Sequence, residues 1–171
     1  MKSKLLLLLT LFVSTFSWGQ TATYTVATTT SVTTGGTIPL GSTASYSQTF
    51  GTAKQITSGN SATLTLSGYT GKKITSIILE MRSNASAGAG TLNVTAGSTS
   101  IASVSPTAAF NTASWYGAWS SSYVNVTKTP SAYSIGAGEN VVIHIAGTAN
   151  SIYIQKYTIV YEDACTDPGL A

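Results

Sequence analysis

The feature that most constrains this chain is a two-residue alternation of apolar and polar side chains, repeated along short segments. It is clearest in SATLTLS, where Ala62, Leu64 and Leu66 face one way and the threonines between them face the other. Because successive side chains of a strand point to opposite faces of a sheet, each such segment predicts a strand with one buried face. No segment carries the 3.6-residue apolar stripe of a helix.

About nine segments of this kind follow one another, separated by Gly, Ser and Asn turns, a spacing typical of sandwiches and barrels. The expected strands are 22–26, 44–50, 61–67, 72–83, 91–96, 99–104, 123–127, 138–147 and 151–162. They predict an all-β fold, an antiparallel two-sheet sandwich that is jelly-roll-like. An immunoglobulin-like sandwich is the alternative, but the chain lacks its Cys…Trp…Cys framework.

The two-residue alternation is interrupted in the segment KKITSIILEMRS, residues 72–83. There Ile77, Leu79 and Met81 share one face of the strand, and Ile74 is out of phase with them. We therefore expect either a β-bulge in this strand or a strand that is buried on both faces.

The first residues of the chain, 1–19, are predicted to be a signal peptide. Lys2 and Lys4 are followed by an apolar run over 5–16 that is short for a bilayer span, and then by small residues that fit cleavage after Gly19. No later run is long enough to cross a membrane. The expected location is therefore secreted or at the cell surface.

The predicted β-sandwich domain covers 20–162, and 163–171 is predicted to be a linker. The linker contains Asp-Pro-Gly and the lone Cys165, which has no partner for an internal disulfide once the signal is removed. We expect further domains of the same chain to follow Ala171.

The charge of the mature chain argues against a nucleic-acid partner. Six basic and five acidic residues remain after signal removal, which gives a net charge of +1. A nucleic-acid binder needs a basic stripe that neutralises phosphates, and here the only adjacent basic pair is Lys72-Lys73.

Catalytic chemistry requires an acid, a base, a nucleophile or a metal, and the folded body offers few of these. Glu80, beside Arg82, is expected in a surface ion pair, Glu139 in a turn, and His144 as a half-buried strand residue. We therefore predict no catalytic residue, no metal site and no cofactor. Calcium held by backbone and Asn oxygens with Glu139 stays an open alternative that no motif supports.

The aromatic segment ASWYGAWSSSY, residues 113–123, is the candidate functional feature. Its rings are either a ligand platform or a plug that caps the core at one end of the sandwich, with Gly117 allowing a tight turn. Nearby polar side chains would bind the ligand if their loops converge. The candidate ligand-binding residues are Trp115, Tyr116, Trp119, Asn111, Arg82 and Asn84.

Three stretches carry a resemblance to known modules: GYTGKKITSIILEMRSNASAGAGTLNVTAGSTSIASV, FNTASWYGAWSSSYVNV and GENVVIHIAGTANSIYIQKYTIVYED. Together they cover most of 24–162. The chain resembles galactose-binding-like jelly-roll modules of large secreted and cell-surface bacterial proteins, which are exported by a C-terminal sorting signal. The resemblance implies an accessory module that binds or spaces and does not catalyse.

Two functions are therefore open. The first is a non-catalytic glycan-binding or adhesive module, whose partner is a polysaccharide or surface glycan. The alternative is a structural spacer or partner-docking domain of a larger secreted enzyme or adhesin.

Overall fold

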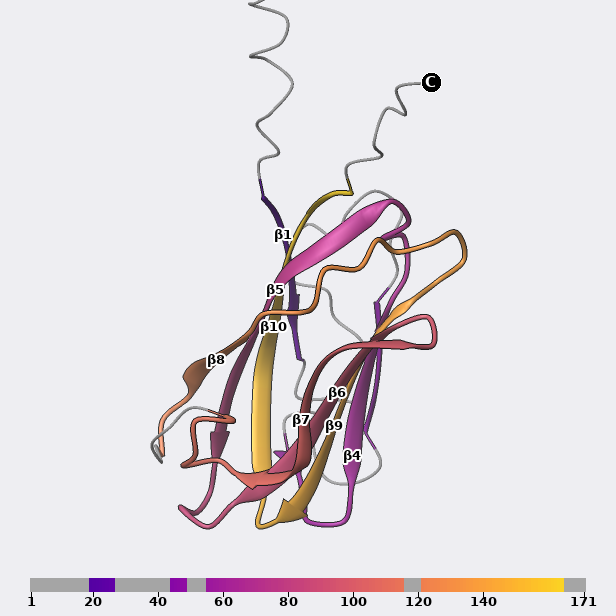
Figure 1. Cartoon of the computed structure of the whole chain (residues 1–171). Coiled ribbons are helices and arrows are strands. Elements are labelled where there is room, and N and C mark those ends of the chain that lie inside the picture. The colour runs from indigo at the N-terminus through magenta and orange to yellow at the C-terminus, as the bar shows by residue number, and fades with distance from the viewer. Residues whose placement is uncertain (1–18, 27–43, 49–54, 116–120, 165–171) are drawn as a thin grey trace, which may run out of the picture.

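In the computed structural model, which describes residues 19–26, 44–48, 55–115 and 121–164, the regular structure is entirely β (Figure 1). The strands are β1 (Gln20–Thr25), β2 (Ala44–Gln48), β3 (Gln55–Ile56), β4 (Ser61–Leu66), β5 (Lys72–Ser83), β6 (Ala89–Ala96), β7 (Thr99–Ala109), β8 (Val124–Lys128), β9 (Val141–Ala149) and β10 (Ile152–Asp163). The strand β3 was not expected, because two residues are too few to display an alternation. Residues 1–18 of the predicted signal peptide and 165–171 of the predicted linker, Cys165 included, lie outside the described residues, and both segments stay predictions.

The strands pair in a nested order. β3 pairs with β10, β4 with β9, β5 with β8 and β6 with β7, all antiparallel. Sheet A has the order β1-β10-β5-β8, with β1 and β3 along successive parts of the same edge of β10, and sheet B has the order β2-β4-β9-β6-β7. Such a rolled-up nest of hairpins is a jelly roll, so the predicted antiparallel two-sheet sandwich is confirmed.

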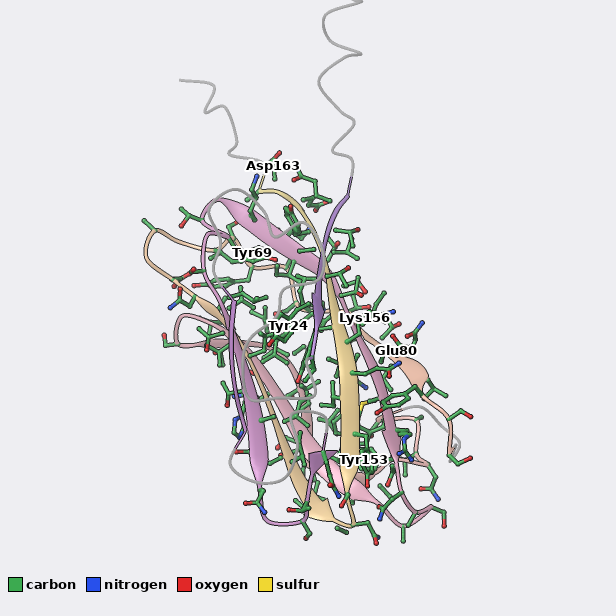
Figure 2. The ribbon with its side chains drawn as sticks, turned by 180° about the vertical axis from the view of Figure 1, so that it is seen from behind. Tyr24, Tyr69, Glu80, Tyr153, Lys156 and Asp163 are labelled. Atoms are coloured by element: carbon green, nitrogen blue, oxygen red, sulfur yellow. The ribbon has the colours of Figure 1, made fainter. Side chains whose placement is uncertain are left out.

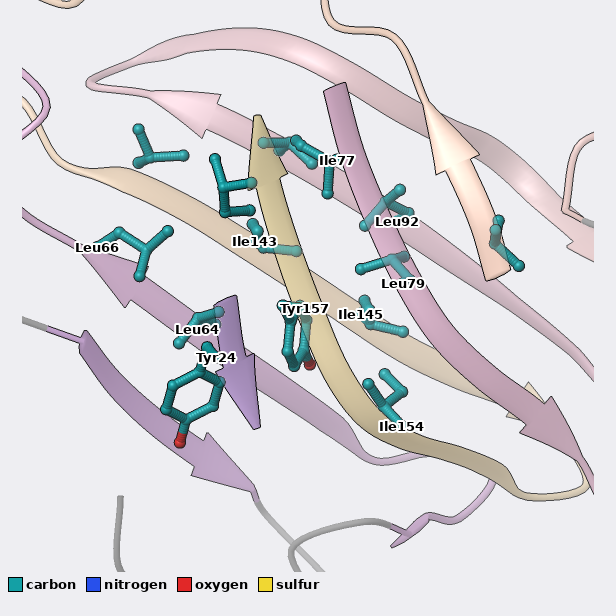
Figure 3. Close-up of a cluster of buried hydrophobic side chains, with 14 of the residues drawn as sticks. Tyr24, Leu64, Leu66, Ile77, Leu79, Leu92, Ile143, Ile145, Ile154 and Tyr157 are labelled. Carbon is teal, nitrogen blue, oxygen red and sulfur yellow. The ribbon is translucent and has the colours of Figure 1, made fainter. Parts of the chain in front are cut away.

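The core lies between the two sheets, and the alternation read from the sequence decides which side chains enter it. Figure 3 shows Leu79 and Tyr157 of sheet A near Leu64, Ile143 and Ile145 of sheet B, and none of these five is exposed. The intervening residues of β4 and β9 are only partly buried, on the outer face of sheet B. Burial of one face of each sheet is the main stabilising contribution to such a fold.

The irregularity in β5 is a β-bulge. Val160 of β10 faces Ser76, and the next residue, Tyr161, faces Ile74, so that Thr75 is an extra residue in β5. The extra residue reverses the phase of the strand, and Ile74 therefore reaches the core on the same face as Ile77. Of the two alternatives for this segment, the structure shows the bulge.

A second bulge explains why β7 is longer than expected. In β6, Leu92 pairs with Val104 of β7, and Gly90 pairs with Ala108. Three residues of β7, 105–107, therefore lie opposite the single residue Thr91 and form the bulge. Pro106 lacks a backbone N–H and normally ends a strand or sits at an edge. Here it lies in the bulge of an edge strand, and pairing with β6 resumes after it.

One buried hydroxyl in the core leads to a stability prediction. The Tyr69 side chain is fully buried, its ring meets the ring of Tyr161 edge-on with centroids 5.3 Å apart, and no described residue hydrogen-bonds to its Oη. We expect Tyr69→Phe to raise the free energy of unfolding by about 1 kcal/mol, because an unsatisfied buried hydroxyl is costly. Urea unfolding followed by circular dichroism measures this. The matched control is Tyr133→Phe, which removes a hydroxyl that donates to Glu139 and should lower stability.

The effect of Tyr69→Phe on stability should depend on pH. Burial, and secondarily Tyr161, raise the pKa of Tyr69 above its ordinary value of 10. A raised folded-state pKa contributes stability that is lost as the pH rises past the unfolded value. The gain in unfolding free energy of Tyr69→Phe over the parent protein should therefore grow above pH 10. A gain that is the same at pH 7 and pH 10.5 would contradict the raised pKa of Tyr69.

Candidate ligand-binding sites

Trp115 lies in the core rather than on the surface. Its side chain is 3% exposed, its ring meets Phe110 edge-on with centroids 4.9 Å apart, and its Nε1 donates a hydrogen bond to the Ala108 carbonyl over 3.1 Å. It follows β7 at the side of the sandwich where β7 and β8 are edge strands. For Trp115, the geometry supports the plug and not the ligand platform.

The other candidate residues are not gathered around Trp115. Tyr116 and Trp119 lie outside the described residues. Asn111 is exposed in the turn after β7. The Asn84 side chain accepts a hydrogen bond from the Ser151 backbone N–H over 2.8 Å, which ties the turn after β5 to the turn before β10.

Arg82, by contrast, lies within an aromatic row on the outer face of sheet A. Its guanidinium carbon is 4.1 Å from the centroid of the Tyr153 ring and 5.4 Å from that of Tyr123. Tyr153 of β10 is the direct cross-strand partner of Arg82, and Tyr123 precedes β8 on the other side. Gln55 extends the row, because its Nε2 donates to the Tyr153 hydroxyl over 3.2 Å. Figure 2 shows Tyr153 on β10 from this side.

The nearest charges on this face belong to a separate pair. Glu80 binds Lys156 with an N···O distance of 2.5 Å and accepts a hydrogen bond from Gln155 (Figure 2). The hydrogen bond from Lys156 is the main cause that lowers the pKa of Glu80. Glu80 is therefore in a surface ion pair, as expected, and its partner is Lys156 rather than its strand neighbour Arg82. Among the described residues, Arg82 has no carboxylate within salt-bridge distance.

The remaining groups with acid–base chemistry are engaged in local contacts. Glu139 accepts hydrogen bonds from the Tyr133 hydroxyl at 2.9 Å and the Gly136 N–H at 2.7 Å, so it closes the turn before β9. His144 is half-buried on the outer face of sheet B, with its Nδ1 2.9 Å from the Thr63 hydroxyl. Within the described part of the chain, no three His, Cys, Asp or Glu residues are grouped as metal ligands.

A pocket of about 350 Å³, which we call the Lys128 pocket, opens between the edge strands β7 and β8. The bulge of β7 forms one wall, and Ser114 and Lys128 form part of the other. This pocket was not predicted from the sequence. In VNVTK, however, Lys128 has the same phase as Val124 and Val126, which pack on the core. A lysine at such an inward position is unusual, and this could have marked the pocket in the sequence.

The surroundings of Lys128 restrain its ammonium group. Its Nζ donates to the Ser114 carbonyl and lies 5.6 Å from the centroid of the Trp115 ring. Burial lowers the pKa of Lys128, because desolvation disfavours the charged form. The plug residue Trp115 and its neighbour therefore position the ammonium at the pocket.

Comparison with known proteins finds likeness among solved structures but none in sequence. No protein-family model and no curated protein matches the sequence. Among solved structures, the chain is similar to a family two carbohydrate esterase from Cellvibrio japonicus, with 6% sequence identity and a TM-score of 0.42. The match covers 84% of this chain and 34% of that one, so the chain spans about a third of its length.

The fold defines the class of protein: a jelly-roll β-sandwich. It carries an aromatic row on the outer face of sheet A and a pocket between the edge strands β7 and β8. No helix in the described ranges is long and apolar enough to cross a membrane.

Proposed function

We propose that this chain is a non-catalytic, secreted or cell-surface module that binds glycan chains along the aromatic row. The observation that carries the proposal is the stacking of Arg82 between Tyr153 and Tyr123 on the outer face of sheet A. All three side chains are partly exposed, and the described residues supply no counter-charge to the guanidinium.

The chemistry of the row suits a sugar. A pyranose ring presents an apolar C–H face and a rim of hydroxyls, and a tyrosine offers an apolar ring with a polar tip. Arg82 adds N–H donors in a fixed planar fork, and stacking on the two rings limits the rotamer entropy that it would lose on binding. Because the row crosses β10 and β5 and reaches the start of β8, it suits an extended chain rather than a single small molecule.

The contacts of the acidic groups support a role without catalysis. Glu80 pairs with Lys156 and accepts a hydrogen bond from Gln155. Glu139 accepts hydrogen bonds from the Tyr133 hydroxyl and the Gly136 N–H. Glu162 and Asp163 pair with Lys73 and Lys72 near the end of β10. None of these four carboxylates forms a hydrogen bond or an ion pair with Arg82, Tyr123 or Tyr153.

The test is affinity gel electrophoresis of the chain in gels that contain single neutral or acidic polysaccharides. We expect at least one polysaccharide to retard the protein, and Tyr153→Ala to weaken that binding about tenfold, as loss of a stacked ring and its cation–π contact implies. Thr127→Ala, an exposed change on the same sheet, is the matched control and should bind normally. If no polysaccharide retards the folded protein, or if both variants bind alike, the proposal fails and the spacer alternative is favoured.

A further inference from the structure

Lys128 occupies a position that a strand of this sandwich would normally give to an apolar side chain. Val126, two residues before it, is buried in the core, and the cross-strand partner of Lys128 is the buried Ile77. Placing an ammonium group there costs desolvation energy unless a counter-charge is supplied.

No described residue supplies that counter-charge. Lys72, Lys73 and Lys156 each have a carboxylate within 4 Å, whereas within the described ranges Lys128 has none. The ammonium donates to the Ser114 carbonyl, and an ammonium has three N–H donors. Among the residues that the structure describes, the other two donors have no hydrogen-bond partner, and Lys128 lines the pocket.

The pocket wall opposite Lys128 is rich in hydroxyl groups. Ser103, Ser105 and Thr107 line it, and all three are exposed. The bulge in β7 brings 105–107 out of the ladder with β6, so they are not held by cross-strand pairing. A volume of about 350 Å³ is at the lower end of ligand pockets, which suits one sugar-sized unit.

We propose that the Lys128 pocket binds the carboxylate of a small polyhydroxylated acid of the hexuronate class. The ammonium of Lys128 pairs with the carboxylate, while the hydroxyls of Ser103, Ser105 and Thr107 bond to the hydroxyls of the sugar. A free hexuronate and a hexuronate at the end of a glycan chain share this chemistry. The pocket is separate from the aromatic row, so this proposal does not depend on the row binding glycans.

The burial of Lys128 is consistent with this ligand class. Desolvation lowers the pKa of its ammonium, and a bound carboxylate would offset that cost by direct pairing. A neutral sugar offers no such pairing. Discrimination between an acid and its neutral counterpart should therefore depend on Lys128.

The test is an NMR titration of the isotope-labelled full chain with D-glucuronate, with D-glucose at matched ionic strength as the neutral counterpart. We expect glucuronate to shift the amide signals of 103–108 and Lys128, and glucose to bind at least tenfold more weakly, as a charge-assisted hydrogen bond implies. D-Galacturonate and its trimer, trigalacturonate, form a second arm. Tighter binding of the trimer than of its monomer assigns the pocket to chain ends, and equal binding of the two assigns it to the free acid as well.

Three variants make the test decisive. Lys128→Met should weaken glucuronate binding at least tenfold, whereas Lys73→Met, which removes the same charge from the Glu162 pair, should not. Tyr153→Ala should retain the pocket signal even if it abolishes polysaccharide binding. Equal binding of glucuronate and glucose, shifts confined to other residues, or unchanged binding by folded Lys128→Met would each overturn the proposal.

Discussion

Replacing Trp115 by alanine is expected to lower the free energy of unfolding by about 3–5 kcal/mol. The indole is almost fully buried, packs edge-on against Phe110 and donates to the Ala108 carbonyl. Its removal would leave a cavity beside β7 and β8, which are edge strands of the described sheets, and it would deprive the part-buried Ala108 carbonyl of its hydrogen-bond donor. The loss should therefore exceed that of any surface change considered above.

Urea unfolding followed by far-ultraviolet circular dichroism measures this effect without relying on the tryptophan itself. Trp115→Phe is the informative companion, because it keeps an aromatic ring but loses the hydrogen bond. We expect the lost hydrogen bond to lower the free energy of unfolding by about 1 kcal/mol, and the smaller ring to lower it further. A Trp115→Ala protein that unfolds like the parent but no longer binds polysaccharide would show instead that the ring contacts ligand.

The sheet faces were predictable from sequence because burial on one face imposes a period of two on every strand. The break in that period at Ile74 was visible for the same reason, but a bulge and a strand buried on both faces explained it equally well until the pairing with β10 was known. The strand β3 and the second half of β7 were not readable. Two residues define no period, and the bulge at 105–107 interrupts the alternation where Pro106 already suggests an end.

The aromatic row was only partly predictable. Arg82 was a candidate, but Tyr153 lies about seventy positions away in the chain and meets it only through the register of β10 on β5. Pairing register depends on both strands and their turns, and one sequence does not reveal it. The aromatic segment was conspicuous because its rings are adjacent in sequence, and yet its described tryptophan, Trp115, serves the core.

The glycine run in SNASAGAG has a packing role that the sequence did not reveal. Gly88 and Gly90 are buried, and Phe110 lies against both. A Cβ built on Gly88 would be 2.0 Å from Ser83 Oγ and 2.9 Å from the Phe110 ring, and one on Gly90 would be 3.3 Å from that ring. The Phe110 N–H also donates to the Gly88 carbonyl. Glycine therefore lets the ring that supports Trp115 approach the backbone of β6 and the turn before it.

Substituting Gly90 by alanine should consequently destabilise the fold by about 3 kcal/mol, at the upper end of typical overpacking costs. The new Cβ would lie 2.6 Å from the Ala146 carbonyl oxygen and 3.0 Å from Ile152 Cδ1. The first contact is with the backbone of the paired strand β9, so a change of side-chain rotamer does not relieve it. The strands β6 and β9 would have to separate locally.

Gly136→Ala is the matched control for this substitution. There the atoms nearest to the added Cβ belong to the Glu139 side chain at 3.3 Å, which can shift without separating two strands, and the backbone N–H that donates to Glu139 is retained. We expect a change within about 0.5 kcal/mol, as for ordinary surface positions. Urea midpoints of the two variants, measured side by side, give the comparison. Equal stability of Gly90→Ala and Gly136→Ala would mean that β6 and β9 tolerate a side chain at this crossing, and that Phe110 and Trp115 do not depend on the close approach.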